Sequence, residues 1–191
     1  MPNFCELGIF FWRNSKNVKP TLIEIKAKCE NTDEIEAILL KNDADFIGLD
    51  HQVDTYFETS KGRLKLREGN IECHLIFYNR PNQASPKESN VILYKPQDVA
   101  LLKEILINAY KVKVVVDKKR KIFFIDNVKF HIDRVEGLGD FMEIEAIDID
   151  NTIKTTTLQE QCSYFMRLLN IKEKDLISHS YSDLLLKKEF I

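Results

Sequence analysis

Three short segments of this chain alternate strictly between apolar and charged residues, and this alternation limits the possible folds more than any other feature. The segments are Leu22–Lys26, Leu64–Glu68 and Phe141–Glu145. Successive side chains of a β-strand point to opposite faces, so within each segment the charged residues share one face and the apolar residues share the other. Charges of both signs recur at matching spacing. The pattern predicts a barrel with a charged lumen, suited to a polyphosphate and its metal ion, and with helices on the outside.

Composition excludes several classes of partner. The formal net charge of −2 over 191 residues gives no general attraction to nucleic acid or to anionic membranes, so we expect neither partner. The four cysteines are scattered without a CxxC pair, which predicts reduced thiols and a cytoplasmic protein. No apolar run approaches the ~20 residues that a membrane-spanning helix requires.

Turn and capping residues divide the chain into alternating elements. We expect an N-terminal arm over 1–19 and one domain over 20–191. Helices are predicted after Asn31 and after Asp98, and over 157–169 and 174–187. Strands are predicted near 21–29, 52–58, 62–68, 71–80, 89–94, 112–125, 128–135 and 140–149. The fold class is therefore α+β, with an antiparallel sheet of about eight strands, which is large enough to close.

Seven segments carry a resemblance to a known family through their order and spacing. They are Ile23–Lys26, Gln52–Phe57, Gly62–Glu68, Pro86–Asn90, Lys118–Arg120, His131–Asp133 and Glu136–Glu145. From about Leu22 to Leu186 the chain resembles the CYTH superfamily of triphosphate tunnel metalloenzymes, which includes class IV adenylate cyclases and thiamine triphosphatases. The resemblance implies an eight-stranded antiparallel barrel that is open at both ends, with the active site inside.

The first strand departs from the family signature Glu-x-Glu-x-Lys at one position. This chain has Leu22, Glu24 and Lys26 there. Both glutamates of the signature help to bind metal, so the resemblance implies Glu24 as a metal ligand and Lys26 as a catalytic residue. Leu22 leaves open whether one or two metal ions bind.

The basic residues form the predicted phosphate-binding set. Lys65 and Arg67 share one strand face, as do Lys118 and Arg120. Arginine binds phosphate through two parallel hydrogen bonds, whereas lysine acts as a point charge. Taken alone, the run at 118–120 would more often be a solvated turn; the resemblance favours the lumen. The resemblance implies Arg80 and Lys129 as further members on other strands, so the predicted substrate-binding residues are Lys65, Arg67, Arg80, Lys118, Arg120 and Lys129.

The acidic residues form the predicted metal site. An isolated Glu-x-Glu is usually a solvated strand face, but Met142 and Ile144 should pack against outer helices and thus turn Glu143 and Glu145 into the lumen. Carboxylate oxygens suit Mg²⁺ or Mn²⁺. The predicted metal ligands are Glu24, Glu143 and Glu145, and Asp133 is predicted to be catalytic. His131 shares the face of Asp133, and we interpret it as a hydrogen-bonded barrel residue in preference to a proton carrier.

Three functions remain open at this level. The first is an adenylate cyclase of class IV type, which converts ATP into cyclic AMP and pyrophosphate. The second is a hydrolase of inorganic triphosphate, thiamine triphosphate or a nucleoside triphosphate. The third is a non-catalytic binder of polyphosphate or nucleotide, which Leu22 favours. The apolar run Phe10–Trp12 suggests a docking surface and a homodimer.

Overall fold

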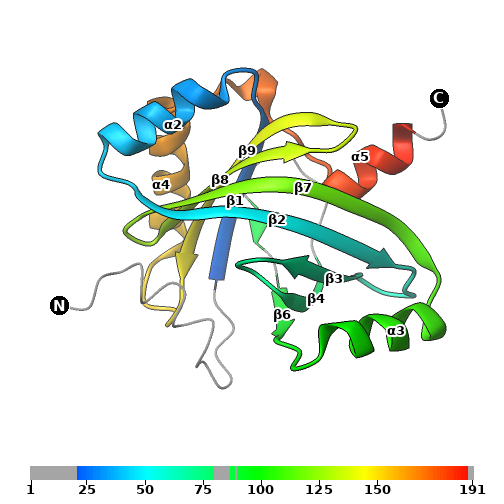
Figure 1. Ribbon diagram of the computed structural model, residues 1–191. Coiled ribbons are helices and arrows are strands. Elements are labelled where there is room, and N and C mark those ends of the chain that lie inside the picture. The colour runs from blue at the N-terminus through cyan, green and yellow to red at the C-terminus, as the bar shows by residue number, and fades with distance from the viewer. Residues whose placement is uncertain (1–20, 80–86, 89, 189–191) are drawn as a thin grey trace.

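One antiparallel sheet that curls strongly on itself dominates the computed structural model, which describes residues 21–79, 87–88 and 90–188 (Figure 1). The strand order is β5-β1-β9-β8-β7-β2-β3-β4-β6. The strands are β1 (Thr21–Lys28), β2 (Asp45–Phe57), β3 (Arg63–Gly69), β4 (His74–Asn79), β5 (Lys87–Glu88), β6 (Asn90–Tyr94), β7 (Val112–Ile125), β8 (Val128–Val135) and β9 (Gly139–Asp148).

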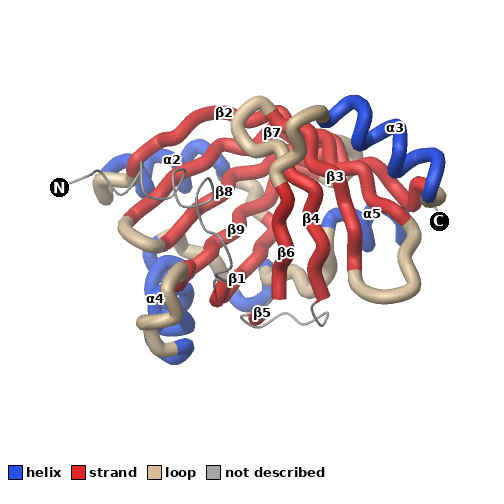
Figure 2. Tube along the Cα trace, turned by 90° about the horizontal axis from the view of Figure 1, so that it is seen from below, coloured by secondary structure: helices blue, strands red, loops and turns tan. Residues whose placement is uncertain are grey.

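The two ends of this strand order belong to neighbouring stretches of the chain. β5 pairs with β1, and β6 pairs with β4. Because β5 ends at residue 88 and β6 begins at residue 90, the two edges of the curled sheet must lie close together, as the view from below shows (Figure 2). β6 corresponds to the strand predicted near 89–94, and the two-residue β5 has no counterpart among the predicted strands. The predicted α+β fold with an antiparallel tunnel is confirmed.

The helices lie outside the curled sheet or at its ends. α2 and α4 lie together on one side, whereas α3 lies beside β3, β4 and β6 (Figure 1). The helices are α2 (Thr32–Lys41), α3 (Val99–Ala109), α4 (Thr155–Leu168) and α5 (Tyr181–Lys188), with a 3-10 turn η1 (Glu173–Asp175). Asn31 and Asp98 cap α2 and α3 through their side chains, as the sequence predicts.

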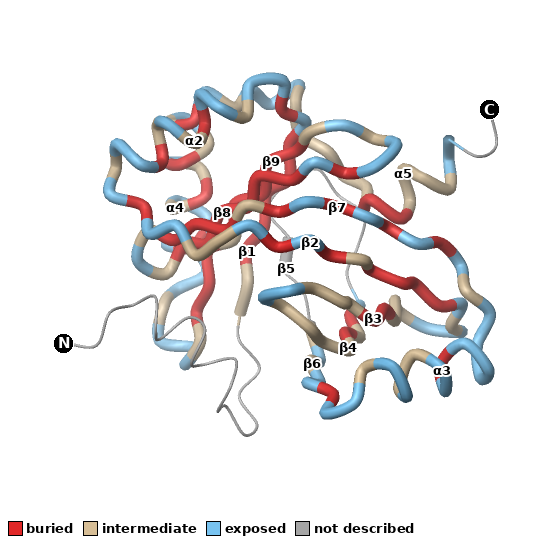
Figure 3. The backbone as a smooth tube through the Cα atoms, in the orientation of Figure 1, coloured by how far each residue is buried: buried red, intermediate tan, exposed pale blue. Residues whose placement is uncertain are grey.

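Alternation along the strands separates the core from the lumen. Ile25 of β1 and Met142 and Ile144 of β9 are buried in one apolar cluster with Leu158 and Cys162 of α4. The charged residues between them point to the other face, as predicted. They are also buried, so the central strands are buried on both faces (Figure 3). A charged lumen and an apolar outer core are therefore built from the same strands.

The helix predicted over 174–187 is wrong in its first half. The chain makes the short turn η1 and then an extended segment, in which Leu176 bridges to Ala27 and the Ile177 amide donates to the Lys26 carbonyl at 2.8 Å. These backbone groups pair with the edge of β1, so they are not available for helical hydrogen bonds. The helix α5 begins only at Tyr181.

α5 also alters the expected shape of the tunnel. Tyr181 is buried with Tyr56, Val116, Val135 and Phe141, which lie on the lumen-facing side of their strands. This apolar cluster fills the end of the curled sheet that the resemblance implied to be open.

One further difference concerns the start of β2. β2 begins at Asp45 instead of near 52, and a bulge between Phe46 and Gly48 interrupts the alternation that would have revealed its first half.

The predicted arm over 1–19 lies outside the described residues. Within the described part of the chain, no helix is long and apolar enough to cross a membrane.

Candidate active site

A cavity of about 280 Å³ lies inside the curled sheet. Side chains from β1, β2, β3, β4, β6, β7, β8 and β9 line it, together with the start of α5. Ten of the eleven predicted site residues fall within the described part of the chain, and nine of them line this cavity: Glu24, Lys26, Lys65, Arg67, Lys118, Arg120, Lys129, Glu143 and Glu145. Arg80 lies outside the described residues.

Three of the predicted phosphate-binding residues gather around Asp54 of β2. Lys65 Nζ and Lys118 Nζ donate to Asp54 Oδ2 at 2.7 and 2.8 Å. Arg67 donates from Nε to Asp54 Oδ1 at 2.8 Å and from Nη2 to Oδ2 at 3.0 Å. We call Lys65, Arg67 and Lys118 the cationic cluster. Asp54 is its internal counter-ion.

Glu72, in the turn between β3 and β4, is a second counter-ion. It binds Arg67 Nη1 through Oε2 at 2.8 Å and contacts Lys129 Nζ through Oε1. Buried Asp50 fixes this turn because its carboxylate accepts from the backbone amides of Ile71 and Glu72 at 2.9 and 3.0 Å. The cations of β3 and β8 are thus joined across the lumen by one carboxylate.

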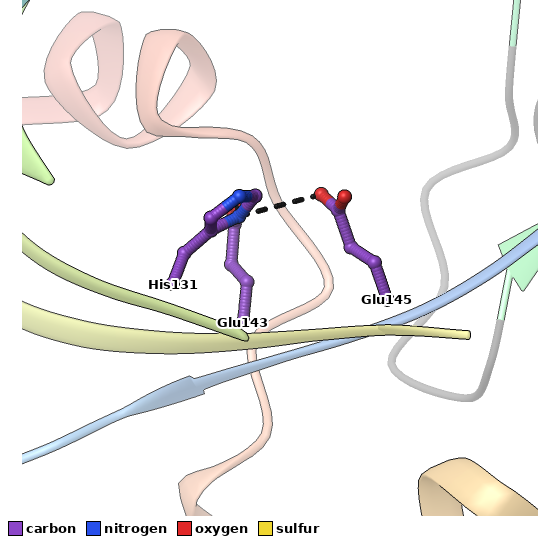
Figure 4. A group of neighbouring side chains, drawn as sticks. All are labelled: His131, Glu143 and Glu145. Atoms are coloured by element: carbon purple, nitrogen blue, oxygen red, sulfur yellow. Dashed lines mark hydrogen bonds and ion pairs between the residues drawn. The ribbon is translucent and has the colours of Figure 1, made fainter. Parts of the chain in front are cut away.

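Another part of the cavity wall holds a group of possible metal ligands. His131, Glu143 and Glu145 offer ligand atoms that all lie within 4.8 Å of one another. The three side chains rise from β8 and β9 on the same side (Figure 4). We call them the acidic cluster. Glu24 stands opposite Glu145 in the β1–β9 register and lines the same cavity.

Glu143 connects the acidic cluster to two cations. Its Oε1 lies 2.5 Å from Lys26 Nζ, and its Oε2 accepts from Arg120 Nη2 at 2.7 Å and lies 3.1 Å from His131 Nδ1. Lys26 Nζ also lies 3.7 Å from the centre of the Tyr181 ring. Lys26 and Arg120 therefore hold the Glu143 carboxylate from two sides.

Asp133, predicted to be catalytic, is fully buried and holds Arg120. Arg120 donates from Nε and Nη2 to the two oxygens of Asp133 at 2.6 and 2.5 Å, and the Tyr181 hydroxyl donates to Oδ2 at 2.8 Å. Such a bidentate pair fixes the guanidinium in one orientation. In this structure Asp133 orients Arg120 toward Glu143.

Burial and neighbouring charges divide the ionisable groups of the cavity. Burial alone would raise the pKa of Asp54, but Arg67, Lys118 and Lys65 hold that pKa well below its usual range. In the same way Lys129 and Arg67 outweigh burial and lower the pKa of Glu72. Burial lowers the pKa of Lys118 to about 7, against the opposing attraction of Asp54. Asp54 and Glu72 are therefore ionised at neutral pH.

In the acidic cluster, burial and neighbouring charges shift the pKa values of Glu145 and His131 so that their charged forms are disfavoured. Burial, with repulsion from Glu143 and Glu24, raises the pKa of Glu145 to about 7, although Lys129 opposes this. Burial, Arg120 and Lys129 lower the pKa of His131 to about 3, so its imidazole is neutral. An ionised carboxylate can only accept, so His131 donates from Nδ1 to Glu143. Buried Nε2 then carries the lone pair, and it has no partner among the described residues.

These observations fit a divalent cation in the acidic cluster. Neutral imidazole and carboxylate are ligands that Mn²⁺ accepts, and Mg²⁺ binds through carboxylates and substrate phosphates. A cation would also relieve the repulsion among the buried carboxylates.

Some residues of the site are not in the predicted set. Asp54 lies in the segment Gln52–Phe57 that resembles the family, but its sequence context predicts no role for it, and no local pattern indicates Glu72. His131 was interpreted as a hydrogen-bonded barrel residue, and the structure confirms a hydrogen bond while also placing it among the possible ligands. His131 shares a strand face with Lys129 and Asp133, and this is the sequence feature that could have indicated its place in the site.

Comparison with known proteins identifies the family of the chain. The family described as CYTH domain matches residues 21–181. A protein of Methanocaldococcus jannaschii named "putative adenylate cyclase" is 28% identical over 173 residues, which cover 85% of this chain and 97% of the relative.

Two solved structures illustrate the range of the similarity. A Pyrococcus horikoshii protein superposes with a TM-score of 0.75 at 28% identity, over 85% of this chain and 98% of its own. A Hippeastrum protein, described as a "putative adenylyl cyclase" with a dominant triphosphatase activity, shares the fold. Its TM-score is 0.59 at 13% identity, over 88% of this chain and 96% of its own.

Proposed function

The chain belongs to the CYTH family, and from this premise we propose that it is a metal-dependent enzyme that acts on a triphosphate, with ATP converted into cyclic AMP and pyrophosphate. One observation carries the proposal. The cationic cluster and the acidic cluster line the same cavity, and Arg120, a further cation of that cavity, binds Glu143 of the acidic cluster.

The cationic side of the cavity suits the phosphate chain. Lys65, Arg67, Lys118, Arg120 and Lys129 supply the positive charges. A triphosphate carries about four negative charges, and catalysis of phosphoryl chemistry consists mostly of positioning and charge stabilisation. Asp54 and Glu72 hold these cations in place, and a bound phosphate would take over part of their hydrogen bonds. Arg80 stays a predicted member of this set.

The acidic side suits the metal ion. Glu143 and Glu145 would hold Mg²⁺ or Mn²⁺, with His131 and Glu24 beside them. When bound, the ion would supply positive charge that lowers the pKa of an attacking hydroxyl or water. Lys26 keeps Glu143 ionised and in position through the contact at 2.5 Å.

In the cyclase reaction the ribose 3′-oxygen forms a bond to the α-phosphorus while the bond to the bridging oxygen of pyrophosphate breaks. The proton of the hydroxyl passes to solvent water in this step, and the departing pyrophosphate keeps the electron pair of the broken bond, so negative charge accumulates on it. The cationic cluster lies where it can stabilise that charge. Asp133 acts indirectly, as the group that orients Arg120.

Hydrolysis is the second candidate, with water attacking a terminal phosphorus in place of the ribose hydroxyl. Both reactions need the same two clusters. Hydrolysis is favoured by the Hippeastrum protein of this fold, which is described as having a dominant triphosphatase activity. The third candidate, a non-catalytic binder, is favoured by Leu22, which lines the cavity beside Glu24 where the family signature has a glutamate.

One panel of assays separates these candidates. The protein is incubated with ATP, tripolyphosphate or thiamine triphosphate, each with Mg²⁺ or Mn²⁺, and cyclic AMP, pyrophosphate and phosphate are measured. We expect cyclic AMP and pyrophosphate in equal amounts from ATP. Phosphate release without cyclic AMP would identify a hydrolase, and binding without any product would identify a binder.

Matched variants link the product to the cavity. Arg120→Gln removes a lumen cation, and Lys119→Gln removes the neighbouring lysine of β7, which is exposed on the outer face. Turnover should fall about a hundredfold for Arg120→Gln and stay unchanged for Lys119→Gln. Equal activity of both variants would contradict the assignment of the cavity as the active site.

A further inference from the structure

One end of the cavity is lined by apolar side chains that neither phosphate nor metal binding uses. They come from four strands and one turn, and we call them the apolar collar: Leu22, Ile47, Ile71, Phe124 and Ile147.

The register of the sheet places this collar directly beyond the charged residues. Leu22 stands opposite Ile147 in the β1–β9 pair, two residues from the pair formed by Glu24 and Glu145. Phe124 of β7 stands opposite Lys129 of β8, whose Nζ lies 5.8 Å from the centre of the phenyl ring. A ligand that binds the charged part of the cavity therefore has apolar side chains at its next position.

The collar is a continuous part of the lumen wall, and local contacts hold it in position. Phe124 and Ile147 are 8% and 6% exposed, whereas Ile71 is 40% exposed, so the collar runs from the interior to the surface. The Ile71 amide is fixed to Asp50 at 2.9 Å. Its side chain lies over the bulge of β2, where a Cβ on Gly48 would come within 2.9 Å of Ile71 Cδ1. Gly48 has φ +148°, in the region that favours glycine.

The other end of the lumen cannot serve the same purpose. Tyr181 of α5 is buried there against inward-facing residues such as Val116 and Phe141. A triphosphate that is bound to the cationic cluster can extend a bulky substituent past the collar, but not past α5.

We propose that the apolar collar binds the organic part of the substrate, so that this chain prefers an organic triphosphate with an apolar or aromatic group over inorganic tripolyphosphate. The inference rests on the proposed function and refines it. Apolar surface that is removed from water stabilises the complex in proportion to its area, and tripolyphosphate has no such surface.

The test compares ATP and tripolyphosphate as ligands of the full chain by calorimetry, in EDTA so that no metal-dependent turnover occurs. We expect ATP to bind about tenfold more tightly than tripolyphosphate, although tripolyphosphate carries more charge. Equal affinity, or tighter binding of tripolyphosphate, would overturn the inference and leave the proposed function standing. Failure of both ligands to bind, with or without Mg²⁺, would overturn both.

A matched pair of variants locates the effect. Ile71→Ser alters a half-exposed collar residue without opening the core, and Leu49→Ser alters an exposed residue of β2 that does not line the cavity. Ile71→Ser should weaken ATP binding about fivefold and tripolyphosphate binding less than twofold. Leu49→Ser should change neither. An equal loss for both ligands in Ile71→Ser would show a general disturbance of the lumen and contradict the collar. The melting temperature of each variant confirms folding.

Discussion

The cationic cluster and the acidic cluster line one cavity, yet they are prepared for a ligand in different ways. Asp54 binds all three members of the cationic cluster at 2.7 to 3.0 Å, and Glu72 adds a second contact to Arg67. In the acidic cluster, burial and two neighbouring carboxylates raise the pKa of Glu145 to about 7. All members of the cationic cluster share a counter-ion, whereas in the acidic cluster Glu143 is neutralised by Lys26 and Arg120 and Glu145 is not neutralised to the same extent.

This difference indicates how each ligand would act. A phosphate chain must compete with Asp54 and Glu72 for cations that are already oriented, so it gains from positions that are fixed before it binds. At Glu143 a metal ion must share the carboxylate with Lys26 and Arg120, whereas at Glu145 it replaces repulsion among carboxylates with attraction. The predictions below test this contrast, beginning with the largest expected effect.

Removing the charge of Glu143 should have the largest effect, because this proposed metal ligand is also the partner of Lys26 and Arg120. Glu143→Gln keeps the size of the side chain but weakens its contacts with Lys26 and Arg120. We expect turnover to fall about a thousandfold, as measured in a Mg²⁺ titration, with the far-ultraviolet circular dichroism unchanged. The control is Glu136→Gln in the exposed turn between β8 and β9. Activity close to normal at any Mg²⁺ concentration would show that Glu143 is not essential.

Asp54→Asn should show how much the shared counter-ion of the cationic cluster contributes to the free energy of unfolding. Three buried cations lose their shared counter-ion, so the free energy of unfolding should fall by about 3 kcal/mol, as measured by urea titration. Saturating tripolyphosphate should recover part of this loss, because it supplies new negative charge. Asp117→Asn, an exposed partner of His51 on the outer face, is the control. A variant as stable as the natural protein would mean that Asp54 is not the counter-ion that holds the cluster.

The pH dependence of anion binding should identify Lys118. Because burial lowers its pKa to about 7, Lys118 is charged below that pH and neutral above it. An anion favours the charged form, so affinity should fall as the pH rises through about 7. The affinity for tripolyphosphate is measured for the natural protein and for Lys118→Arg. The ratio of the first affinity to the second should fall about tenfold between about pH 6 and about pH 8. The arginine variant stays charged throughout, so it corrects for the titration of tripolyphosphate itself. A constant ratio would place the pKa of Lys118 outside this range.

Leu22→Glu should have the smallest effect, and it tests how added negative charge changes metal binding at the acidic cluster. The new carboxylate stands beside Glu24 and increases the negative charge around the metal ligands. We expect the Mn²⁺ concentration for half-maximal activity to fall about threefold, with screening by salt limiting the gain. Leu22→Gln has the same size without the charge and should not produce this change. Identical metal dependence of the two variants would show that position 22 does not influence the metal site.

The lumen residues were predictable because a strand has a period of two residues. Glu143 and Glu145 alternate with Met142 and Ile144, and the structure confirms that the two pairs face opposite sides. Leu22 faces the lumen for the same reason. Where the pattern is strict, the sequence alone determines which side of the sheet a residue occupies.

Other features depend on contacts that no local pattern contains. Asp54 pairs with cations of β3 and β7, so its role follows from the register of three strands. Glu72 lies in a turn that Asp50 fixes from β2. The residues before α5 pair with β1 although their sequence suits a helix. In each case a long-range partner decides the outcome.

The central claim is that the two clusters hold one unit made of a triphosphate and a divalent cation. The most direct test measures Mn²⁺ binding by electron paramagnetic resonance, with and without saturating tripolyphosphate. Because binding linkage is reciprocal, each ligand should strengthen the other, and we expect Mn²⁺ to bind about a hundredfold more tightly with tripolyphosphate present. Glu143→Gln should abolish most of this coupling. Equal Mn²⁺ affinity with and without tripolyphosphate in the natural protein would contradict the account.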